Sequence, residues 1–186
     1  MGSDNSSVNF SLKSNASIQI GIYFFILAYA IKNILNGFLV DDNPIGMMSA
    51  EIIEILCFSL IFITILLSII ALFFKSRRAS RKNKVPFWNA KTKNISFKVF
   101  ILISLSLLSI ATFTKIGKIN FIAPISFIFY AIILFFVKRP ERKNIIVLSL
   151  LCLLLAITCF FIPSYWYSSI AILAISHIAY GVVVRD

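Results

Sequence analysis

The sequence predicts an all-α integral membrane protein of about six transmembrane helices, arranged as three antiparallel hairpins with both termini in the cytoplasm. Composition is the first reason: 60% of the 186 residues are hydrophobic and the mean hydropathy is +0.96, whereas a soluble domain is roughly 45–50% apolar. The second reason is a set of apolar stretches near the roughly 20 residues that a bilayer-spanning helix needs. The third is the gathering of Lys and Arg in the loops of one side.

Six apolar stretches account for most of the chain. They are residues 17–40, 52–74, 99–114, 119–137, 145–162 and 166–184. Links of a few residues join the third to the fourth and the fifth to the sixth, and such short links force antiparallel neighbours. We therefore expect a flexible N-terminal tail over residues 1–16 and a single transmembrane domain over residues 17–186.

Charge orients these spans. The formal net charge is +11, and basic residues collect on the cytoplasmic side of membrane proteins. The loop 75–98 and the shorter loop 138–143 fall on the same side as both termini, while the other side carries only Lys115 and Lys118 beside Asp41 and Asp42. This asymmetry predicts cytoplasmic termini in a plasma or inner membrane.

The basic loop 75–98 is the largest polar element. Its charge predicts contact with anionic lipid headgroups, and an acidic partner protein is the alternative. Nucleic acid is not expected, because no module with a groove or an aromatic platform is visible. The candidate contact residues are Arg77, Arg78, Arg81, Lys82, Lys84 and Trp88.

Polar residues interrupt the first two spans. Tyr29, Lys32, Asn33 and Asn36 recur at spacings that place them on one helix face. Glu51 and Glu54 begin the second span and also share a face. Ionisable groups in a membrane are functional candidates, so these residues predict an outward-facing ion or substrate site. The alternative is a snorkelling lysine with a structural Lys32–Glu54 ion pair.

His177 is the only histidine, and it lies in the sixth span near Tyr180. The two residues form a second candidate site, for a proton or a ligand. The alternative is a hydrogen bond to a neighbouring helix. The three cysteines show no metal-ligand spacing, and no nucleophile–base set or nucleotide-binding loop can be assembled. We therefore expect no metal, no cofactor and no enzymatic activity.

Two classes of function fit these features. The first is a transport or channel-type protein that handles a small solute or ion as a homo-oligomer or within a complex. The second is a non-transporting membrane subunit, such as an assembly partner, immunity protein or defence component, that acts through the basic loop.

Overall fold

The computed structural model describes residues 12, 14–38, 45–46, 48–82, 88, 90–137 and 145–184, without the side chains at positions 50, 51, 79, 82, 90, 91 and 119. Within these ranges all regular structure is helical, as the sequence predicts. Residues 1–11 and 13 of the predicted N-terminal tail and residue Lys84 lie outside the described residues. The last three residues of that predicted tail, 14–16, belong to α1 instead, so the tail prediction is wrong there. The helices are α1 Ser14–Phe38, α2 Ala50–Lys82, α3 Ala90–Lys115, α4 Ile122–Phe136, α5 Ile145–Phe161 and α6 Trp166–Val183, with short 3₁₀ turns η1 Ile119–Phe121 and η2 Pro163–Tyr165.

Within the described part of the chain, four segments are long and apolar enough to cross a membrane, namely Ser14–Phe38, Ile52–Arg78, Thr92–Lys115 and Pro163–Val183. The helices α4 and α5 are also apolar but shorter, with 15 and 17 residues. Large apolar side chains cover the outside of the bundle, for example Phe100, Leu108 and Val147. Helices that are apolar on their outward faces are typical of a membrane-embedded protein, which confirms this part of the prediction.

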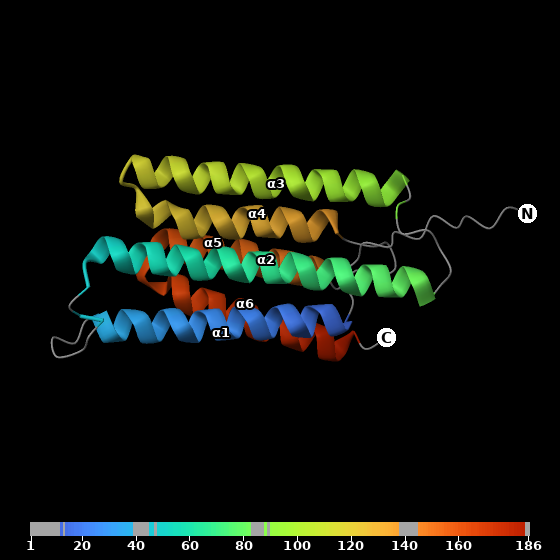
Figure 1. Cartoon of the computed structure of the whole chain (residues 1–186), viewed down its shortest axis with the longest axis horizontal. Coiled ribbons are helices and arrows are strands. Elements are labelled where there is room, and N and C mark those ends of the chain that lie inside the picture. Colours follow the sequence, from blue (N-terminus) through green and yellow to red (C-terminus); the bar gives the residue numbers. More distant parts are fainter. Residues whose placement is uncertain are drawn as a thin grey trace, which may run out of the picture.

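The core lies among α1, α4, α5 and α6. Buried residues from these four helices form one cluster, and a smaller cluster joins α1 to α2. The most extensive helix contacts are between α1 and α6 and between α4 and α5, while α2 packs on α1 and α3 packs on α4 (Figure 1). The closest packing therefore joins helices of different predicted hairpins rather than helices of the same hairpin.

The α1–α6 seam is close because small residues line it. A Cβ added to Gly21 would lie 2.7 Å from Ile178 Cγ1 and 2.8 Å from the Ala174 carbonyl oxygen. A Cβ added to Gly181 would overlap Ile18 and lie 2.7 Å from the Ser14 carbonyl oxygen. Small residues at such positions let two helix backbones approach closely, which is how membrane helices gain packing energy.

Serine hydroxyls tie the tight seams together. Ser14 Oγ donates to the Gly181 carbonyl at 2.6 Å, and Ser149 Oγ on α5 donates to the Ala131 carbonyl on α4 at 2.8 Å. Three hydroxyls of α3 behave differently: those of Ser109, Thr112 and Thr114 each donate to the carbonyl four residues earlier in the same helix. Cross-helix bonds of this kind stabilise the α1–α6 and α4–α5 pairs in a setting that offers no water.

The turn between α3 and α4 is set by Gly117. Its φ of 74° lies in the left-handed region, which glycine adopts without steric cost. The Lys118 amide donates to the Phe113 carbonyl at 3.0 Å and the Gly117 amide donates to the Thr114 carbonyl at 3.1 Å. This pair of bonds is the Schellman motif that ends helices, and it brings the chain back along α3 as α4.

Replacing Gly181 by Leu should open the α1–α6 seam. The added side chain has no room between α6 and α1, and overpacking of this kind costs roughly 1–3 kcal/mol. We expect a lower thermal unfolding midpoint in a fixed detergent. Val182→Leu, at an exposed neighbouring position, is the matched control. A Gly181→Leu protein as stable as this control would contradict the seam.

Candidate functional site

The outward face of α1 changes chemistry along the helix. Near the N-terminal half it presents exposed apolar side chains, which are Ile22, Phe25 and Ile26. One turn further the same face becomes polar. Its exposed members there are Tyr29, Lys32, Asn33 and Asn36. We call these four residues the polar face of α1, and it is the first candidate site predicted from the sequence.

The depth of these residues distinguishes them. The 25 residues of α1 extend about 37 Å at 1.5 Å per residue, only slightly more than the roughly 30 Å apolar layer of a bilayer. Asn33 lies five residues before Phe38, or about 8 Å from the end of the helix. The long stem of Lys32 can carry its ammonium to the interface. The short amide of Asn33 cannot follow, so Asn33 needs water or another polar group at that depth.

Glu54 does not join the polar face. Lys32 and Glu54 are both exposed, and no ion pair between them occurs in the described part of the chain. The reason is that α1 and α2 meet through apolar side chains, with Leu27 and Ile31 packed against Ile53 and Cys57, so the polar side chains of both helices are left on other faces. The side chain of Glu51 lies outside the described residues.

The second candidate site is a fully buried polar centre around His177. Its Nδ1 lies 3.0 Å from Ser17 Oγ on α1, and its Nε2 lies 2.7 Å from Tyr130 Oη on α4. Ser17 Oγ also donates to the His177 carbonyl at 2.8 Å. The Phe24 ring packs beside both the Tyr130 and the His177 rings. One imidazole therefore links three helices.

Counting hydrogens assigns the tautomer of His177. Ser17 has one hydroxyl hydrogen, and the carbonyl of His177 accepts it, so Ser17 Oγ can only accept from the ring. The ring must then carry its hydrogen on Nδ1 and leave Nε2 as an acceptor for the Tyr130 hydroxyl. This neutral Nδ1–H form satisfies every contact, which favours the structural interpretation of His177.

The sequence-based site paired His177 with Tyr180, but the ring partner is Tyr130. Tyr180 is buried in the core cluster, and no hydrogen bond joins its side chain to His177 among the contacts described. The one sequence signal for Tyr130 is the Tyr130–Ala131 pair, which repeats as Tyr180–Gly181 fifty residues later. In both pairs the small residue's carbonyl accepts a serine hydroxyl from an adjacent helix.

The basic residues of α2 form a third surface. Arg77, Arg78 and Arg81 are exposed and border a shallow hollow with Phe74. The 33 residues of α2 extend about 50 Å, so this end of the helix projects well beyond a roughly 30 Å apolar layer. Trp88 is also exposed, and the side chain of Lys82 lies outside the described residues.

No protein-family model, curated protein sequence or solved structure matches this chain. Within the described residues, no group of three or more His, Cys, Asp or Glu side chains is placed to hold a metal ion.

Replacing Tyr130 by Phe tests the His177 centre. The change keeps the ring but removes the donor to Nε2, and a lost interhelical bond in a membrane protein costs about 0.5–2 kcal/mol. We expect a lower thermal unfolding midpoint in detergent than for Tyr165→Phe, which makes the same change at an exposed position. Equal midpoints for the two variants would show that the hydrogen bond does not support the bundle.

Proposed function

We propose that the chain crosses a plasma or inner membrane six times with both termini in the cytoplasm. The support for the two shorter spans is their length together with their flanking turns. The 15 residues of α4 follow the three residues of η1, and at about 1.5 and 2.0 Å per residue the two reach about 28 Å. The 17 residues of α5 reach about 26 Å. Both values approach the roughly 30 Å apolar thickness.

Labelling of single cysteines tests this topology. If α4 and α5 both cross, Glu141→Cys lies on the cytoplasmic side with Arg78→Cys, and a membrane-impermeant thiol reagent reaches neither in intact cells. Lys118→Cys should react. If α4 and α5 do not cross, Glu141→Cys would react together with Lys118→Cys. The three native cysteines are buried and are first replaced by Ala or Ser.

We propose further that the protein is an oligomeric channel or transporter whose path runs between copies of α1. The main support for this proposal is that the polar face of α1 is exposed on the single chain. At the depth of Asn33, lipid would offer its side chain no hydrogen bond. Two or more copies that bring these faces together would enclose a polar, hydrated stretch along residues 29–36, which continues between the apolar side chains Ile22, Phe25 and Ile26. Polar groups inside a membrane commonly mark such pathways.

The chemistry of the polar face favours a small anion. Lys32 is its one charged residue, and Asn33 and Asn36 supply amide donors beside it. Rings of Lys or Arg select anions in pores because they attract anions and repel cations. Lys32 is therefore the residue that sets selectivity in this proposal, and the asparagines are the residues that replace part of the hydration shell.

Flux into proteoliposomes tests the proposal. We expect the purified protein to conduct chloride or a similar small anion. Lys32→Met should lower the flux at least several-fold, because the anion loses its positive partner. Lys118→Met removes the same charge from the turn after α3 and serves as the control. In a cysteine-free background, Asn33→Cys should form disulfide-linked dimers in the membrane, whereas Ile175→Cys on the exposed side of α6 should not.

A non-transporting subunit is the second candidate, and the exposed Arg77, Arg78 and Arg81 favour it. This end of α2 presents three positive charges on one side of a helix that projects from the membrane, which suits an acidic partner surface. Absence of flux, together with loss of a co-purified partner in the Arg77→Gln, Arg78→Gln, Arg81→Gln protein but not in Lys32→Met, would favour this function over the channel.

A further inference from the structure

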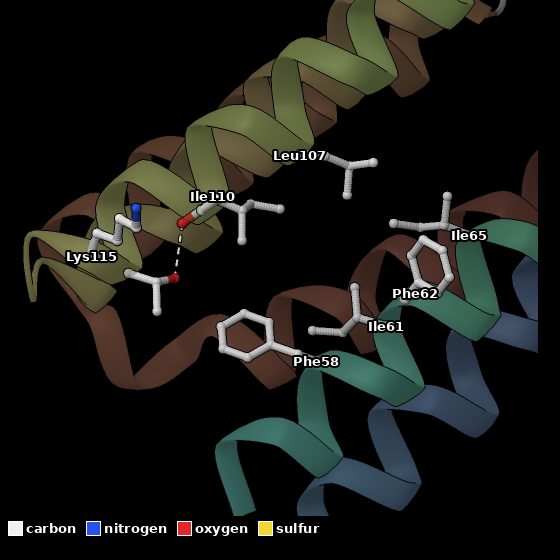
Figure 2. Close-up of a pocket in the computed structure, with 9 residues that line it drawn as sticks. Phe58, Ile61, Phe62, Ile65, Leu107, Ile110 and Lys115 are labelled. Atoms are coloured by element: carbon white, nitrogen blue, oxygen red, sulfur yellow. Dashed lines mark hydrogen bonds between the residues drawn. The ribbon is translucent and has the colours of Figure 1, made fainter. Parts of the chain in front are cut away.

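An open groove runs between α2 and α3. Its walls are Phe58, Ile61, Phe62 and Ile65 on α2 and Leu107, Ile110, Ala111, Thr114 and Lys115 on α3, and its volume is about 430 Å³. Figure 2 shows the α2 and α3 side chains facing one another across the space, with Lys115 at one end. The volume falls within the roughly 300–1,000 Å³ of small-molecule sites.

The groove exists because α2 and α3 do not close on each other as the other seams do. The α4–α5 and α6–α1 seams are closed at small residues, Ala131 and Gly181, whose carbonyls accept serine hydroxyls. The helix α2 packs on α1 and the helix α3 packs on α4, so the α2–α3 seam stays open.

The groove is apolar along its walls and positive at one end. Among the described lining residues, Thr114 carries the one hydroxyl, and Thr114 Oγ1 already donates to the Ile110 carbonyl at 2.8 Å, a bond drawn as the dashed line in Figure 2. Lys115 is the one charged residue in the same described set, and its side chain is exposed. A ligand for this site therefore has a long apolar part and an anionic end.

The length of the groove fits one leaflet. The α3 wall runs eight residue steps from Leu107 to Lys115, which is about 12 Å, and one leaflet of a roughly 30 Å apolar layer is about 15 Å deep. Lys115 ends α3, so its ammonium lies at the interface where headgroups begin. We propose that this groove binds one acyl chain of an anionic phospholipid, with the lipid phosphate held by Lys115.

A second copy of the chain is the competing occupant. A transmembrane helix would need a groove across both leaflets, and its body is about 10 Å wide. The α2–α3 groove extends over the part of the helices near the α3–α4 turn only. Its short length and its single terminal cation are better matched by a lipid chain and headgroup than by a helix.

Photo-crosslinking of lipid to the full-length protein tests this site. The probe is phosphatidylglycerol that carries a photoactivatable group in its acyl chain. Phosphatidylcholine with the same group is the lipid without net charge for comparison, and both are used in vesicles of defined composition. We expect labels to concentrate on peptides that contain residues 58–65 and 107–115. Lys115→Gln should lower the preference for phosphatidylglycerol about five-fold, since a basic residue near the interface contributes about that factor. Lys118→Gln, which is not part of the groove wall, should not.

A second variant tests the groove itself. Ala111→Phe fills the space between the walls and should reduce labelling by both lipids, while Leu108→Phe on the exposed side of α3 should leave it unchanged. Gel filtration of each variant checks that the bundle is intact. Labels spread evenly over all lipid-facing helices, or an unchanged phosphatidylglycerol preference in Lys115→Gln, would overturn the proposal. Disulfide linking of two copies through Ile110→Cys with no lipid label would assign the groove to a second copy instead.

Discussion

The bundle depends on the contact between α1 and α6 and on the buried imidazole at its centre. Lipid chains are as apolar as the helices, so burial of apolar area gives little reason for membrane helices to associate. In this chain α1 and α6 associate because their backbones approach closely at Gly21 and Gly181, and because Ser14 and Ser17 donate hydrogen bonds across the seam. The hydrogen bond between His177 and Tyr130 joins α4 to this pair of helices. The first and last helices of the chain thereby lie side by side in the bundle.

Once α1 and α6 are joined, the remaining helices fall into two classes. The α4–α5 pair completes the core, and Cys159 joins it to α6, where Cys159 Sγ contacts Ser169 Oγ at 3.2 Å. The helices α2 and α3 lie at the periphery, and most of their large side chains face outward. Hydroxyls along the middle of both helices donate to carbonyls of their own helix, as those of Thr64 and Thr114 do. These hydroxyls therefore do not serve as links to a neighbouring helix.

The sequence predicts which stretches are apolar helices, but it does not predict which helices pack against each other. The number of helices follows from the apolar stretches along the chain. Their extent does not: α2 continues to Lys82 and α3 begins at Ala90, so much of the predicted loop 75–98 is helical. In a soluble helix, apolar periodicity also identifies the inward face. Here the outward faces are apolar too, so that signal is lost, and small residues such as Gly21 and Gly181 mark the inside instead. The sequence singles out His177 as a polar residue within an apolar stretch, but it does not reveal the partners Ser17 and Tyr130, which lie on other helices at distant positions.

The same reasoning separates scaffold from surface. The buried His177 ring already uses both nitrogens in hydrogen bonds, so it has none left for a ligand and serves to join three helices. The polar face of α1, the arginines of α2 and the mouth of the α2–α3 groove are all exposed on the bundle. A polar group that faces lipid inside the membrane loses the hydrogen bonds that water would give it, and this loss is unfavourable in free energy. Asn33 should therefore have a partner beyond the single chain, and function is to be sought where this chain meets lipid or another copy.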